Sequence, residues 1–281
     1  GSLQEVVEMA GLFIPKGPVV QVKSKAGSIN VMEDKNSDVA WDGPLAIMVN
    51  HGSASASEIL AAAIQDYKRG IIIGTQSFGK GTVQSFLDLD QYLLPQFDSI
   101  RPLGSVKITM QKFYRINGGA TQLKGVMPDV VLPDPYALLD LGEKDLDYPM
   151  PWDEIAKATY NEYKTINYDK AKKASAERLK TSTAFKLIEA ESKELKSKKD
   201  DTKYSLVLEK YRAEQKELRT QNKKYDALKT DIKGFSAELT GVDRDAMKSD
   251  TIKLNKEIKW TKNIQKDNYI YEATNVMNDM K

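Results

Sequence analysis

The fold is decided by a stretch that reads LAIMVNHGSASASEIL, residues 45–60. Its first five residues are an uninterrupted apolar run, which is typical of a strand buried on both faces. Small residues follow, and a pattern rich in Ala and Ile then predicts a helix that begins at Ser55 or a neighbour and ends at Tyr67. Ile71–Ile73 predicts a second buried strand. A strand, a helix and a strand within about 30 residues indicate a βαβ unit with parallel strands and a right-handed crossover.

Shorter elements surround this unit. Leu3–Phe13 has helical spacing, and the predicted further strands are 19–22, 28–32, 83–89, 105–116 and 125–133, with an irregular surface segment at 91–102. From Tyr136 onward glycine is scarce and lysine and glutamate dominate, so we expect long helices at 171–199, 204–228 and 260–280, a turn at 196–203 and a break at 242–250. The sequence therefore predicts a mixed α/β domain over residues 1–135 and an all-α domain over residues 136–281.

Composition narrows the possible functions. Among 281 residues, 42 Lys and Arg balance 40 Asp and Glu, which argues against a nucleic-acid or membrane-surface role driven by net charge. The absence of cysteine excludes disulfides and a cysteine nucleophile, and a single histidine argues against a histidine-based zinc site. No apolar run is long enough to span a membrane. Because the chain begins with Gly1 rather than Met, we expect a fragment whose targeting segment lies outside it.

The junction between the first buried strand and the helix could hold a nucleophile. Ser53, Ser55 and Ser57 alternate with alanines there, so the choice among them depends on geometry. A serine at this place lies beside the free N–H groups of the first helical turn, which could stabilise an oxyanion. The alternative is that the serine only caps the helix.

The base could be a histidine or a lysine. His51 is the only histidine, but no aspartate is placed to orient it, and Asp66 lies roughly 16 Å along the helix from Ser55, which suits a structural role at the far end. Lys80 follows the second strand of the βαβ unit, and the ends of such strands converge on one edge. No acidic residue adjoins it, so its amine could be desolvated, and Gln84 could hold that amine by a neutral hydrogen bond. We therefore predict a Ser55–Lys80 dyad.

A nucleotide-binding loop is the rival interpretation of the same segment. Gly74–Lys80 matches G-x-x-x-x-G-K, but Gly81 stands where the magnesium-binding Ser or Thr should be. The residues that follow are predicted as a strand, not as a helix whose N-terminus could hold phosphate. We expect no nucleotide.

Four blocks of the sequence resemble the C-terminal processing, or tail-specific, serine proteases: 53–59, 74–84, 113–119 and 124–129. The resemblance covers about residues 1–135, and the lysine-rich tail resembles the extra C-terminal helical domain of the family's larger branch. It implies a ClpP/crotonase-like ββα core and peptide-bond hydrolysis without a metal or cofactor. The site it implies consists of Ser55 as nucleophile, Lys80 as base, Gln84 as orienting residue, Asp66 in support, and oxyanion donors at Ala56 and Gly1.

The resemblance also implies partners and a location. Substrates would be proteins with apolar C-terminal tails, and an adaptor or a lipoprotein would be a further partner. The location would be the periplasm or cell envelope of a bacterium. Family members carry a PDZ domain before this core, and we expect the chain to start after it. A hypothesis of a different class is a non-catalytic scaffold or adaptor whose charged helices bind a partner protein.

Overall fold

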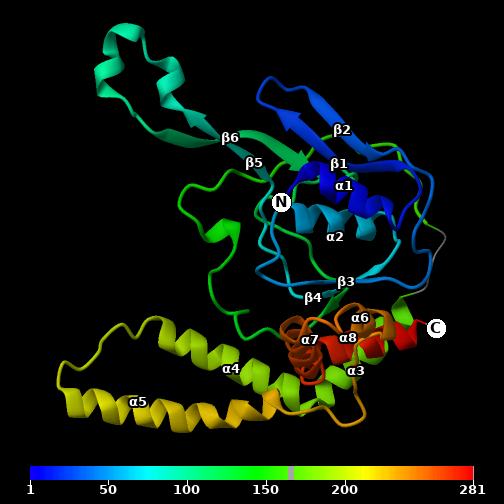
Figure 1. Cartoon of the computed structure of the whole chain (residues 1–281), viewed down its shortest axis with the longest axis vertical. Coiled ribbons are helices and arrows are strands. Elements are labelled where there is room, and N and C mark those ends of the chain that lie inside the picture. Colours follow the sequence, from blue (N-terminus) through cyan, green and yellow to red (C-terminus); the bar gives the residue numbers. More distant parts are fainter. Residues whose placement is uncertain (164–167, 281) are drawn as a thin grey trace. The chain divides into compact units, whose positions relative to one another are not determined.

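The computed structural model describes residues 1–163 and 168–280, which form two compact units (Figure 1). The first unit contains Gly1–Asp129 and the described residues from Asp140 to Tyr163, and the second contains Val130–Leu139 and the described residues from Tyr168 onward. The first unit is a mixed α/β core and the second is mainly helical, which confirms the predicted fold class at this level. The division at residue 135 stays a prediction.

A four-stranded antiparallel sheet forms one layer of the first unit. Its strands are β1 (Gly17–Ser24), β2 (Ile29–Asp34), β5 (Thr82–Asp88) and β6 (Ser105–Tyr114), in the order β2-β1-β6-β5. All four were expected from the sequence, and β6 was expected from its alternating pattern. Since β5 is last in this order, one of its edges pairs with no strand of the sheet.

The predicted βαβ unit is confirmed. It consists of β3 (Ala46–Val49), α2 (Ala56–Asp66) and β4 (Ile71–Gly74), and the two strands pair in parallel from Ala46 opposite Ile71 to Val49 opposite Gly74. Every residue of β4 is buried, as expected. The same prediction is wrong for β3, which lies at the edge of its sheet and leaves Met48 42 % exposed.

Two helices pack together to form the core of this unit. Helix α1 (Leu3–Gly11) starts at the N-cap Ser2, whose Oγ accepts a hydrogen bond from the N–H of Glu5 at 3.2 Å. It packs on α2, whose small alanines allow a close approach, and both helices also contact β1. The core is completed by apolar residues of α1, α2 and the two sheets, among them Val6, Val7, Ala10, Val20, Ile59, Ala62, Ala63, Ile72 and Phe113.

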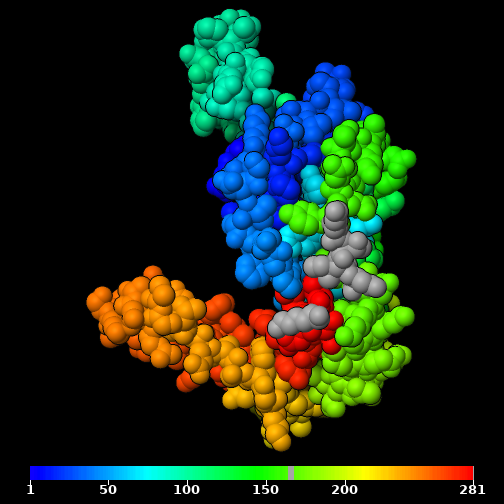
Figure 2. Space-filling model, turned by 90° about the vertical axis from the view of Figure 1, so that its right-hand side faces the viewer, coloured from blue at the N-terminus to red at the C-terminus, as the bar shows by residue number. Residues whose placement is uncertain are grey.

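The hairpin formed by β5 and β6 extends from the first unit as an arm. Figures 1 and 2 both show it projecting from the rest of that unit. Its tip contains two short 3₁₀ turns, η1 (Leu89–Tyr92) and η2 (Pro95–Ile100), where a surface segment was expected. A third 3₁₀ turn, η3 (Glu143–Asp145), belongs to the same unit.

The second unit contains a short strand and shorter helices than the sequence suggested. They are β7 (Val130–Val131), α3 (Asp169–Thr181), α4 (Thr183–Lys199), α5 (Leu208–Asn222), η4 (Lys223–Lys229), α6 (Gly241–Ala246), α7 (Thr251–Ile264) and α8 (Asn268–Asp279). None of the described helices is both long and apolar enough to cross a membrane.

Four of the predicted boundaries in this unit are wrong. The helix expected over 171–199 breaks at Ser182, which has extended backbone (ψ 118°) and caps α4 through its hydroxyl. The helix expected over 260–280 breaks before Asp267, whose Oδ1 accepts from the N–H groups of Tyr269 and Ile270 and so starts α8. The expected break at 242–250 contains α6, and the expected turn at 196–203 begins only after Lys199. Side-chain caps therefore divide this unit where apolar spacing alone suggested continuity.

A buried carboxylate ties α3 to α8. Glu272 is 3 % exposed and accepts from Ser175 Oγ at 2.7 Å and from the Arg178 guanidinium at 2.8 Å. Arg178 also binds Asp279 at 2.7 Å. The group is structural, because each charge is paired within the helical unit.

Candidate active site

The backbone at Ser55 is strained. Its φ is 58° and its ψ is −116°, a combination that residues with a side chain rarely adopt. Ser55 stands directly before α2, so the loop after β3 turns sharply into the helix at this residue. Non-glycine residues held in such conformations gather at active sites, where they expose a reactive side chain.

Hydrogen bonding distinguishes the three serines of this stretch. The Ser53 Oγ accepts from the N–H of Asn50 at 3.1 Å, and the Ser57 Oγ donates to the carbonyl of Ala54 at 2.8 Å. The Ser55 side chain makes no cap hydrogen bond. The N–H of Glu58, which a capping side chain would bind, bonds to the Ser55 carbonyl oxygen at 2.9 Å. Ser55 therefore differs from its neighbours in a way that the capping alternative does not explain.

The lysine-bearing loop needs its glycines. Gly79 has a φ of 94°, which favours glycine, and a Cβ on Gly81 would lie 2.6 Å from the N of Gln122. Lys80 is partly buried, and its Nζ donates to the Oε1 of Gln84 at 3.4 Å. The loop leads into β5 and not into a helix, so it offers no helix N-terminus to a phosphate.

Glu58 joins the serine turn to the lysine loop. It is fully buried, and its Oε2 accepts both from the N–H of Ser55 at 2.8 Å and from the N–H of Lys80 at 2.9 Å. The two backbone nitrogens are therefore separated by no more than the sum of these distances. The Oε1 accepts from Ser77 Oγ at 2.5 Å and from the N–H of Gly79 at 2.7 Å.

This carboxylate is surrounded by four donors. Burial raises the pKa of Glu58 from its usual value, whereas the bonds from Ser77, Gly79, Ser55 and Lys80 act in the opposite direction. The ionised form alone accepts all four bonds, since protonation turns one acceptor position into a donor. A further bond from the N–H of Phe78 to the carbonyl of Ser53, at 2.9 Å, holds the same two segments together.

The start of α2 offers backbone donors beside Ser55. The N–H groups of Glu58 and Ile59 both bond to the Ser55 carbonyl, and among the described residues the N–H groups of Ala56 and Ser57 have no acceptor in this turn. Gly1 also lies here, because a Cβ on it would be 2.6 Å from the Cβ of Ala56. The two predicted oxyanion positions are thus adjacent.

Asp66 lies at the other end of α2 from Ser55. Arg115 binds its carboxylate through Nε at 3.0 Å and through a terminal nitrogen at 2.5 Å, and Asn117 Nδ2 donates to it at 2.9 Å. Burial raises the pKa of Asp66, and the charge of Arg115 opposes this effect. The carboxylate is engaged in these bonds, roughly 16 Å along the helix from the serine.

Sequence reasoning did not identify Glu58 as part of the site. The signal was present, because Ser55-x-x-Glu58 has the spacing of a capping box, in which the glutamate carboxylate binds the backbone of the first residue. What the spacing does not reveal is that the same carboxylate also binds a loop 21 and 22 residues further along the chain.

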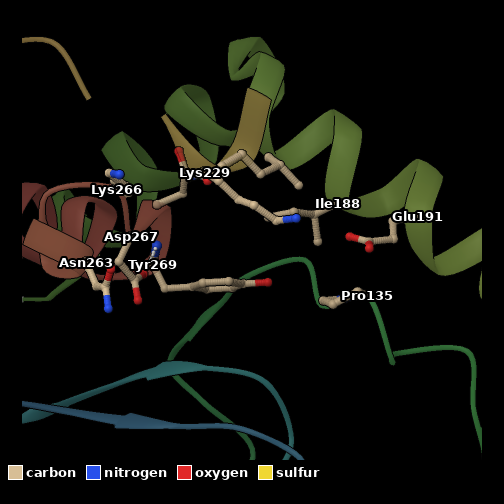
Figure 3. A pocket seen from close by; sticks show the side chains of 10 residues that line it. Pro135, Ile188, Glu191, Lys229, Asn263, Lys266, Asp267 and Tyr269 are labelled. Carbon is tan, nitrogen blue, oxygen red and sulfur yellow. Dashed lines mark hydrogen bonds between the residues drawn. The ribbon is translucent and has the colours of Figure 1, made fainter. Parts of the chain in front are cut away.

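A pocket in the second unit contains none of these residues. It has a volume of about 480 Å³ and is lined from α4, η4, α7, α8 and the segment at Pro135, as Figure 3 shows. The apolar side chains of Ile188, Leu228 and Tyr269 meet both positive and negative groups there. The lining holds no serine or other obvious nucleophile, and we assign it no chemistry.

Two family models match the chain. The model of peptidase family S41 matches residues 1–132, and the model of the C-terminal domain of tail-specific protease matches residues 136–281. The tail-specific protease of Haemophilus influenzae is 48 % identical over 174 residues, which cover 60 % of this chain and 24 % of that protein. The carboxy-terminal-processing protease of Bartonella bacilliformis is 35 % identical over 153 residues, covering 52 % of this chain and 33 % of that one.

Among solved structures, a photosystem II D1 C-terminal processing protease is similar to 47 % of the chain, with 33 % identity, a TM-score of 0.40 and 31 % of its own length covered. The chain thus spans between about a quarter and a third of the length of these relatives.

Proposed function

Since the chain belongs to the S41 peptidases and carries the C-terminal domain of their tail-specific members, we propose that it is part of a serine endopeptidase with Ser55 as nucleophile and Lys80 as base. The observation that carries the proposal is the single oxygen of Glu58 that binds the backbone of both residues. The strained backbone of Ser55 and the lack of a cap hydrogen bond from its side chain support the choice of this serine.

The reaction would proceed in two steps. The neutral amine of Lys80 takes the proton of the Ser55 hydroxyl as the oxygen attacks the scissile carbonyl carbon. The tetrahedral intermediate collapses to an acyl-enzyme when the lysine returns that proton to the leaving amine. Water then attacks the ester, the lysine again takes a proton, and the Ser55 oxygen leaves with that proton while the carboxylic acid is released.

Three further features of the site would assist. The N–H of Ala56, with that of Gly1 beside it, is placed at the start of α2 to stabilise the developing oxyanion, where the helix dipole adds a favourable potential. Gln84 orients the Lys80 amine through an uncharged side chain. Asp66 acts in support by fixing the far end of α2 through Arg115.

The remaining expectations follow from family membership. We include in the proposal a ClpP/crotonase-like arrangement of the core, a catalytic domain that ends near residue 135, and a helical domain of residues 136–281. The substrates would be proteins recognised by apolar C-terminal tails, with an adaptor or lipoprotein as a further partner. The relatives are bacterial, and the location would be the periplasm or cell envelope.

Covalent labelling separates this function from that of a non-catalytic scaffold. A fluorophosphonate probe added to the full-length protein should attach to Ser55, because it phosphonylates a serine only where a base and oxyanion donors activate the hydroxyl. Peptide mapping identifies the labelled residue, and Ser55→Ala is the control. A full-length protein that stays unlabelled would favour the scaffold.

A further inference from the structure

We propose that the free outer edge of β5 binds an extended, uncharged segment of the substrate polypeptide, which joins the sheet as an additional strand. This inference rests on the proposed function and adds to it the way in which substrate is held. Strand β5 is the last strand of its sheet, and β6 pairs with only one of its two sides. Among the described residues, no bond is seen from another segment to the opposite side.

The backbone groups on that side can be identified from the register. The N–H of Leu89 bonds to the carbonyl of Gly104 at 3.0 Å, just beyond the pairs Asp88–Ser105, Leu87–Val106 and Phe86–Lys107. Hydrogen-bonded and non-bonded pairs alternate along an antiparallel ladder. The N–H and C=O of Phe86 and Asp88 therefore point away from β6, toward the free edge.

Most of this edge lacks the usual protection against strand addition. Proteins block exposed edges with charged side chains, especially lysine, or with proline. Six of the seven residues of β5, Thr82 to Leu87, include no charged residue and no proline, and Asp88 at the end of the strand is its one charged residue. Among these six, Phe86 is 74 % exposed, which suits an apolar partner. An edge of this kind is the feature that peptide-binding proteins use for β-strand addition.

The direction of β5 connects the edge to the candidate site. The strand begins at Thr82, two residues after Lys80, and runs out along the arm (Figures 1 and 2). Glu58 holds the serine turn against the lysine loop, from which β5 begins. A substrate segment that pairs with the edge of β5 is therefore directed along the strand toward the serine turn. Backbone pairing recognises extended chain rather than particular side chains, so it selects unfolded segments over folded ones.

Methylated peptides test the pairing directly. Peptide substrates of the full-length protein, each N-methylated at one backbone position, should show KM values that rise about tenfold at alternate positions and stay unchanged between them, because each bonded amide lost weakens binding modestly. An effect without this alternation would overturn the proposal.

A pair of protein variants gives a second test. Phe86→Pro removes an outward N–H while keeping the ladder to β6, and should raise KM for polypeptide substrates about tenfold relative to Phe86→Ala, which lacks only the ring. Fluorophosphonate labelling of Ser55 should be the same in both. If the two variants have equal KM values, the edge does not bind substrate. If the wild-type protein is a dimer, and Phe86→Pro dissociates it while KM stays unchanged, the edge binds a second copy of the chain instead. Failure of labelling in the wild type would refute the proposed function.

Discussion

Replacing either Ser55 or Lys80 by alanine is expected to lower peptide cleavage by about 10⁴-fold or more, because nucleophile and base act as one unit. For the same reason the double variant should be no less active than either single variant. The measurement is kcat/KM of the full-length protein on a peptide with an apolar C-terminus. Binding of that peptide should persist in the variants, since neither side chain is assigned a role in holding substrate.

Three neighbouring substitutions serve as controls for this experiment. Ser53→Ala and Ser57→Ala remove hydroxyls that make local hydrogen bonds, and His51→Ala removes a group to which we assign no chemistry. All three variants should keep cleavage within about tenfold of the wild type, as expected for the loss of single neutral hydrogen bonds. Substantial turnover by Lys80→Ala would exclude the lysine as base, and a large loss in His51→Ala would restore the histidine alternative.

Glu58→Gln is expected to lower kcat about 100-fold with little change in KM, as a displacement near 1 Å at the reacting groups can do. At the Oε2 position the amide NH₂ group faces the N–H groups of Ser55 and Lys80, and at the Oε1 position it faces the N–H of Gly79, so in either orientation at least one hydrogen bond to the serine turn or the lysine loop is lost. Ser55 and Lys80 then lose part of the connection that holds them together. Each unpaired donor should also cost about 1–3 kcal/mol of stability.

The matched control is Glu272→Gln, which alters a buried glutamate of the helical unit. Breaking its pairing with Arg178 should destabilise the protein by about 3 kcal/mol while leaving kcat unchanged. Thermal unfolding and kcat are measured for both variants well below their melting temperatures. If Glu58→Gln loses stability but keeps the wild-type kcat, Glu58 is a structural residue only.

The features that sequence revealed are those that depend on neighbouring residues in the chain. The apolar run before residue 50 and the run at Ile71 predicted the parallel strands, and the alternation in β6 predicted its length within two residues. The helix breaks at Ser182 and Asp267 were missed because a single side-chain cap outweighs continuous helical spacing.

The features that sequence could not reveal depend on contacts between distant segments. The three serines at 53, 55 and 57 look alike in sequence, and only the backbone angles and hydrogen bonds of the folded chain separate them. Glu58 could be read as half of a capping box, but its bonds to Ser77, Gly79 and Lys80 exist only once the loop after β4 has packed against α2. The free edge of β5 likewise follows from strand order, which no local pattern specifies.

The dyad is tested most directly by trapping the covalent intermediate. Full-length protein mixed with an activated ester of an apolar peptide, quenched in acid within the first turnover and digested, is analysed by mass spectrometry. We expect an acyl group on Ser55 that forms in the wild type and is strongly suppressed in Lys80→Ala. An acyl group on another residue, or product formed at the full rate with no adduct on Ser55, would contradict it.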